Sequence, residues 1–129
     1  MSRRNRTYLF VSAAEPLAAA EAAWSAPAPI DLCVTGPSRH AHDAARFACA
    51  GRSIQIIEEP LLATPFPGES GVDVTSRHAG ALRALYALDT RSALVVWDEV
   101  APPERGPLLV DEAWLVHTAD FIEHHLPLP

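Results

Sequence analysis

Four short apolar runs, separated by segments of helical pattern, constrain the fold of this 129-residue chain more than any other feature. They cover residues 7–13, 31–36, 53–58 and 92–98. Each is rich in β-branched and aromatic residues and nearly continuous in apolarity, which is typical of strands buried on both faces of a parallel sheet. We therefore expect these runs to lie side by side in one sheet.

Helical patterns fill the gaps between these runs, at residues 15–24, 38–50 and 72–87. The second segment follows Pro37 and stops at Gly51, the order in which helices use these two residues. In the third segment, residues at spacings of three and four form a stripe that is expected to face the sheet: Val74, His78, Ala81, Leu82 and Leu85. The alternation predicts one α/β domain over residues 1–129, a three-layer α/β/α sandwich with a mostly parallel central sheet.

The C-terminal part gives a weaker pattern. A fifth strand is predicted at residues 113–118, followed by a short helix at residues 119–125. The longest irregular stretch inside the domain is the proline-containing segment 60–71, which is equally consistent with a site loop and with a structural crossover.

Composition excludes several classes of function. The formal net charge is −6 and the chain holds no lysine, which argues against a nucleic-acid binder. Arg3, Arg4 and Arg6 precede the first apolar run and are interpreted as a solvated terminus. Cys33 and Cys49 have no partner at a metal-ligand spacing and are interpreted as buried free thiols, so no metal or cofactor is expected. Without a membrane-length apolar run, the chain is expected in a reducing cytoplasm. The many alanines and arginines, together with the absence of lysine, indicate a bacterium with a GC-rich genome.

Two segments resemble the histidine phosphatase superfamily, which includes the cofactor-dependent phosphoglycerate mutases. Residues 34–45, VTGPSRHAHDAA, are similar to the family's second-strand and helix motif, S-S-P-L-x-R-A-x-x-T-A. Residues 67–85, PGESGVDVTSRHAGALRAL, are similar to the more specific pattern P-G-G-E-S-x-x-D-V-x-x-R-x-x-x-A-L-x-x-L. The resemblance implies a truncated phosphoglycerate mutase-like fold.

The reactive residues of that family are absent. The family's first strand ends in Arg-His-Gly, whose histidine attacks phosphorus, whereas Ser12, Ala13 and Ala14 stand at these positions. Asp98 replaces the second histidine. A phosphohistidine mechanism needs an imidazole aligned with phosphorus and cations around the phosphate oxygens. The resemblance therefore implies a protein without phosphatase or mutase activity.

Other polar residues mark a candidate site at the carboxyl ends of the predicted strands, where open α/β sheets bind ligands. His40 aligns with the family's phosphate-contacting arginine and Arg39 lies beside it. His42 points about 200° away from His40 on a helix, so both cannot enter one crevice. No catalytic residue stands out, and the candidate catalytic or ligand-binding residues are Ser12, Arg39, His40, Glu69, Asp98 and Glu99.

Two functions are consistent with these residues. The first is a non-catalytic binding, regulatory or assembly module, whose partner is another protein or a second copy in a homodimer, with a small-molecule ligand in the crevice as a further option. The second is a small enzyme that uses Asp98, Glu99 and His40 for different acid–base chemistry in the same crevice.

Overall fold

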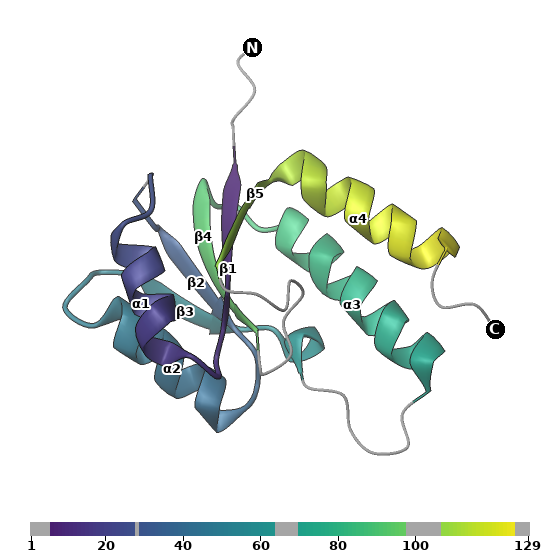
Figure 1. The fold of residues 1–129 in the computed structure, drawn as a ribbon. Coiled ribbons are helices and arrows are strands. Elements are labelled where there is room, and N and C mark those ends of the chain that lie inside the picture. Colours follow the sequence, from purple (N-terminus) through teal and green to yellow (C-terminus); the bar gives the residue numbers. More distant parts are fainter. Residues whose placement is uncertain (1–5, 28, 64–69, 98–106, 126–129) are drawn as a thin grey trace, which may run out of the picture.

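The computed structural model describes residues 6–27, 29–63, 70–97 and 107–125, in which helices flank both faces of one sheet (Figure 1). The strands are β1 (Thr7–Ser12), β2 (Leu32–Thr35), β3 (Gln55–Glu58), β4 (Ser92–Trp97) and β5 (Leu108–Asp111). The helices are α1 (Pro16–Trp24), α2 (Arg39–Cys49), α3 (Gly71–Tyr86) and α4 (Glu112–His125), and a short 3-10 helix, η1, spans Pro60–Leu62.

The strand order is β3-β2-β4-β1-β5. Strands β1 to β4 run parallel and β5 runs antiparallel to β1, so the predicted α/β fold with a mostly parallel sheet is confirmed. The central strand β4 is buried along its whole length between β1 and β2, with Leu94 paired to both Leu9 and Cys33. Strand β3 lies at an edge and is exposed at both ends, so the expectation of a strand buried on both faces is wrong there.

Alternating side chains of the strands build two separate cores. On one face, Val11 and Val96 pack with the alanines of α1 and α2. On the other face, Phe10 and Trp97 pack with α3 and α4, including Leu85 of the predicted stripe. Within that stripe Ala81, Leu82 and Leu85 are buried, while Val74 and His78 are half-buried. The stripe therefore faces the sheet as predicted.

Alanine sets the close packing of the α1–α2 layer. The sheet-facing side of α2 is lined by Ala41, Ala44, Ala45 and Ala48, all buried. The helix begins after Ser38, whose Oγ accepts a hydrogen bond from the Ala41 amide at 3.0 Å. It ends before Gly51, which has a φ of 74°, a conformation that glycine adopts without steric cost.

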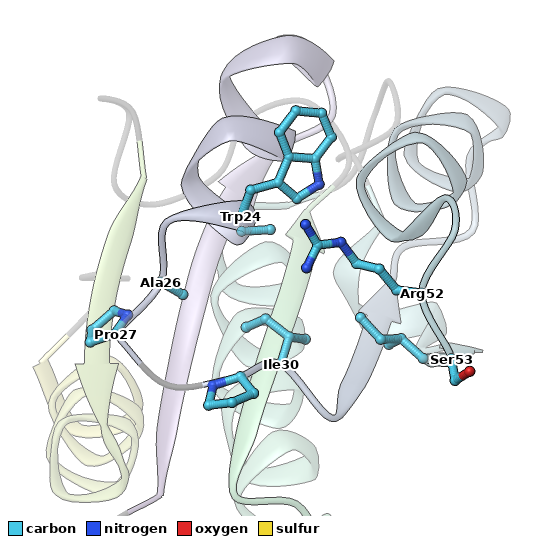
Figure 2. A pocket seen from close by; sticks show the side chains of 9 residues that line it. Trp24, Ala26, Pro27, Ile30, Arg52 and Ser53 are labelled. Atoms are coloured by element: carbon cyan, nitrogen blue, oxygen red, sulfur yellow. The ribbon is translucent and has the colours of Figure 1, made fainter.

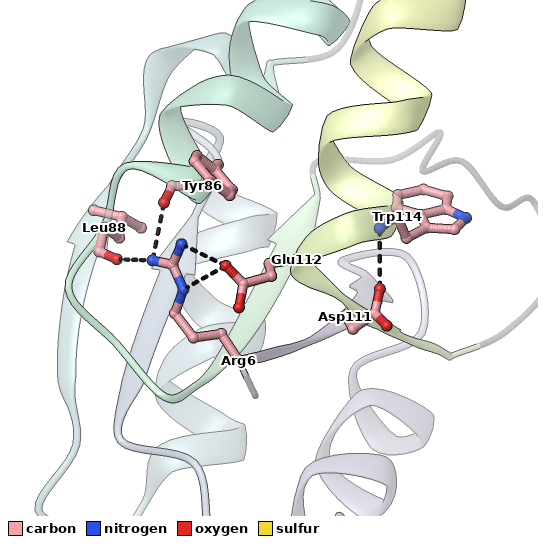
Figure 3. Close-up of polar contacts among 6 residues, drawn as sticks. All are labelled: Arg6, Tyr86, Leu88, Asp111, Glu112 and Trp114. Carbon is pink, nitrogen blue, oxygen red and sulfur yellow. Dashed lines mark hydrogen bonds and ion pairs between the residues drawn. The ribbon is translucent and has the colours of Figure 1, made fainter. Parts of the chain in front are cut away.

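The predicted fifth strand is wrong in type and position, whereas the helix predicted at residues 119–125 is confirmed as part of α4. The segment predicted as a strand at residues 113–118 is part of α4, and the fifth strand lies earlier, at β5. Asp111 starts the helix by accepting a hydrogen bond from the Trp114 amide at 3.0 Å (Figure 3). Buried Leu115 and Ala119 then recur four residues apart, a helical spacing that the short run of apolar residues concealed.

Arg6 connects three elements and is not the solvated terminal residue that its sequence position predicts (Figure 3). Its guanidinium donates to the carbonyl oxygens of Tyr86 and Leu88 at 3.0 and 2.8 Å, where α3 ends. It also pairs with Glu112 at the start of α4, at 3.0 Å. The cation thus lies at a helix C-terminus and the carboxylate at a helix N-terminus, the favourable placement for both charges.

Asp31 fixes the amino-terminal end of the sheet. Its carboxylate accepts hydrogen bonds from the Thr90 hydroxyl and from the Arg91 and Ser92 amides, which lead into β4. Burial opposes the charged form, but these hydrogen bonds outweigh it and lower the pKa of Asp31 below its ordinary value.

Cys33 of β2 and Cys49 of α2 are both buried and lie in one core. A hydrogen bond between the two thiols, together with burial, raises the pKa of Cys33 far above its ordinary value. The same hydrogen bond, aided by the charge of Arg52, lowers the pKa of Cys49. Both thiols are free, as the sequence indicates, but the fold makes them neighbours across 16 positions of sequence.

Candidate functional site

The carboxyl ends of β1, β2, β3 and β4 lie at one edge of the sheet, where the sequence predicts a site. Ser12 is the last residue of β1 and lies opposite Trp97, the last residue of β4. Helices α1 and α2 both begin near this edge, because each follows a strand that ends there (Figure 1). Ser12, Arg39 and His40 therefore all lie at this edge of the sheet, as their positions in the sequence predict.

Ser12 serves the turn into α1. Its Oγ accepts a hydrogen bond from the Ala14 amide at 3.1 Å, and its carbonyl oxygen accepts one from the Glu15 amide at 3.2 Å. Ala13 is buried, and its amide donates to the Trp97 carbonyl oxygen at 3.0 Å. The pairing of β1 with β4 thus continues past Ser12, and a methyl group occupies the position that the family resemblance assigns to a nucleophile.

Arg39 and His40 are the first two residues of α2, and both side chains are exposed. Within the described residues neither side chain forms a hydrogen bond or ion pair, so the structure does not join them to Ser12. The other three candidates, Glu69, Asp98 and Glu99, lie outside the described residues.

His42 forms a contact that the sequence reading did not identify. Its Nε2 lies 2.8 Å from Oε1 of Glu58, the last residue of β3. The two histidine side chains point in different directions, as predicted. His40 is exposed at the start of α2, and His42 turns toward Glu58 at the edge of the sheet. An imidazole beside a carboxylate is an acid–base arrangement, but no described hydroxyl or thiol is bonded to it as a nucleophile.

His78 lies beneath the same edge, on the α3 side. Its half-buried ring lies edge-on to Trp97, with ring centroids 5.4 Å apart and an interplanar angle of 86°. Trp97 in turn lies 5.8 Å from Phe10, which lies 5.8 Å from Trp114. These contacts place His78 at the side of an aromatic cluster, in keeping with the core position that its place on the α3 stripe predicts.

A hollow of about 470 Å³ lies at the opposite end of the sheet, around the segments that enter β2 and β3 (Figure 2). Trp24 forms one wall, and Arg52 holds its guanidinium over the indole at 5.8 Å from the ring centroid. Seven of the nine lining residues are apolar in type, namely Ala23, Trp24, Ala26, Pro27, Pro29, Ile30 and Ile54, and the other two are Arg52 and Ser53. The sequence does not indicate this hollow, because the alanines and prolines after α1 are typical of an ordinary loop.

Comparison of the chain with models of protein families, with curated proteins and with solved structures finds no match in any of the three. Among the described residues no cluster of three or more histidine, cysteine, aspartate or glutamate side chains is arranged to hold a metal ion. No helix in the described ranges combines the length and apolarity needed to cross a bilayer.

Proposed function

We propose that this protein is a non-catalytic member of the histidine phosphatase-like group that acts as an assembly module. On this proposal it works through a binding surface and does not turn over a substrate. The end of β1 carries the proposal, because Ala13 offers only a methyl group and Ser12 uses its hydroxyl oxygen in the turn that follows. Neither side chain supplies the imidazole that a phosphohistidine intermediate requires.

The distribution of well-packed and exposed residues also supports a binding role. Both faces of the sheet are covered by cores of buried apolar residues. Several large apolar side chains nevertheless remain exposed on the helices, including Leu17, Trp24 and Phe47. Exposed apolar groups that gather in one place are typical of protein contact surfaces.

Phosphate release from p-nitrophenyl phosphate between pH 5 and pH 8 tests the absence of catalysis. We expect no release above a buffer blank from the wild type or from an Arg39→Ala/His40→Ala variant purified in parallel, because the end of β1 offers no nucleophilic imidazole. Release by the wild type that disappears in the variant would contradict the proposal. It would favour the acid–base enzyme instead, and Asp98→Ala would then identify the participating carboxylate.

Sedimentation velocity tests the assembly role. The measurement is made on epitope-tagged protein in a fresh cell extract and on purified protein at high concentration. In at least one of these two preparations, we expect the protein to sediment faster than a monomer. A monomer in both would refute an assembly role, whatever the outcome of the phosphate assay.

A further inference from the structure

The outer side of the α1–α2 layer exposes a line of large apolar side chains. Leu17 is 58% exposed, Trp24 47% and Phe47 46%. Leu17 and Trp24 are seven residues apart on α1, about two helical turns, and therefore lie on the same side of that helix. Trp24 meets Phe47 of α2, with ring centroids 6.3 Å apart. We call Leu17, Trp24, Phe47 and the polar residues around them the α1–α2 face.

Trp24 is held in place on this face. Its Nε1 donates to the Ala48 carbonyl oxygen at 3.0 Å, Phe47 lies beside the ring, and the Arg52 guanidinium covers it from the hollow (Figure 2). A side chain fixed before contact loses little conformational entropy on binding. Rigid, partly exposed aromatic residues are the usual centres of protein interfaces.

The two helices of this face carry opposite charges. Glu15 and Glu21, at the start of α1 and on its surface, are exposed, and neither pairs with a described cation. The outer side of α2 carries the exposed Arg39 and Arg46, with Asp43 bound to Arg46 at 2.6 Å. The carboxylates are six residues apart and the arginines seven, which at the rise of an α-helix correspond to about 9 and 10.5 Å.

Both helices run in the same direction, because each returns from the carboxyl end of a parallel strand, and they pack directly against each other (Figure 1). A two-fold axis along the groove between them would place α1 of one copy over α2 of the other. Glu15 would then meet Arg39 of the second copy, and Glu21 would meet Arg46. The aromatic residues would lie near the axis.

We propose that the α1–α2 face binds the same face of a second copy of this chain, as a two-fold dimer held by Trp24 and Phe47 and aligned by the α1 carboxylates and α2 arginines. The inference rests on the proposed assembly function and names its partner. A face whose two halves are complementary in charge fits its own copy, since an isologous interface must be self-complementary.

The size of the face predicts a reversible dimer. The eleven residues of α2 extend over about 16 Å, and two adjacent helices are roughly 20 Å wide. Even with the rim of the hollow, the contact stays at or below the roughly 800 Å² per partner of a standard interface. We therefore expect a dissociation constant on the order of micromolar, with affinity that falls as salt screens the paired charges.

A charge exchange tests the interface. Sedimentation velocity between roughly 1 and 200 μM should show a monomer–dimer equilibrium for the wild type, and Glu21→Arg or Arg46→Glu alone should weaken it by about tenfold, since each places like charges together. The double variant Glu21→Arg/Arg46→Glu should recover the wild-type affinity. An equimolar mixture of the two single variants should also dimerise, because both contacts are then between opposite charges.

Arg91→Glu is the matched control, because it makes the same charge change as Arg46→Glu at an exposed position away from the face. It should leave the equilibrium unchanged. A monomer throughout the concentration range, or a dimer that neither single reversal weakens, would overturn the assignment of this face. Circular dichroism of each variant distinguishes lost association from lost folding. Phosphate release by the wild type is measured separately from its association, so failure of the dimer and failure of the non-catalytic proposal can be told apart.

Discussion

Replacing Arg6 by methionine tests whether one terminal side chain joins the sheet to both helices of the α3–α4 layer. The change keeps an apolar stem and removes the guanidinium. It deletes the hydrogen bonds to the carbonyl oxygens of Tyr86 and Leu88, at 3.0 and 2.8 Å, and leaves Glu112 without its cation. It also removes the stacking of the guanidinium on the Tyr86 ring, whose centroid is 4.8 Å away.

The expected loss follows from the partial burial of the pair. The Arg6 and Glu112 side chains are 17% and 23% exposed, so the pair is neither fully exposed nor fully buried. An exposed pair contributes up to about 1 kcal/mol, and breaking a buried pair costs about 3–5 kcal/mol, so the loss should lie between these values. With the two carbonyl contacts included, we expect the free energy of unfolding to fall by about 3 kcal/mol. For a chain of 129 residues this corresponds to a decrease in Tm of about 10 °C.

Urea and thermal unfolding followed by circular dichroism measure this loss, with Arg91→Met as the control because that side chain is exposed. A double-mutant cycle with Glu112→Gln isolates the ion pair and should give a coupling free energy of about 1 kcal/mol. The reasoning is refuted if Arg6→Met changes Tm no more than the control, or if it is equally destabilising with and without the Glu112 carboxylate.

Three further outcomes are expected. Asp31→Asn should destabilise the protein by about 1–2 kcal/mol at pH 7, since the Thr90 hydroxyl and nearby amides lose a charged acceptor. Because folding lowers the pKa of Asp31, the difference in unfolding midpoint between the wild type and this variant should shrink as the pH falls below about 4. A maleimide at pH 8 should label Cys49 before Cys33, and equal rates by peptide mass mapping would contradict the opposite shifts of their pKa values. Gly51→Ala should lower the free energy of unfolding by about 1 kcal/mol, and no loss in urea titration would show that the φ of 74° is not required.

Local patterns were sufficient to predict the first four strands and the first three helices. Turn residues such as Pro37 and Gly51 mark helix ends directly, and the α3 stripe shows its own buried side. The position of β4 between β1 and β2 could not be predicted, because the residues of a strand do not specify which strands it pairs with. Near the C-terminus, Leu115 and its neighbours form an apolar run too short to distinguish a strand from a helix.

The site was predicted less well than the fold. The strand ends correctly locate Ser12, Arg39 and His40 at one edge, since that follows from parallel order alone. The pair of His42 with Glu58 depends on which face of α2 meets β3, which needs the packed layer. Arg6 was misjudged for a similar reason, because its partners lie about 80 or more positions away in sequence.

The central position of β4 has a consequence for synthesis of this protein. Residues 7–58 supply β1, β2 and β3, but β1 and β2 do not pair with each other. Each of them pairs with β4, residues 92–97, which lies between them in the sheet. A nascent chain that has not yet released this segment from the ribosome therefore carries two apolar strands with open inner edges, which are prone to pair with other chains. Ribosome-bound fragments ending before residue 92 should consequently depend on holding chaperones, and fragments that expose the whole of β4 should become resistant to protease.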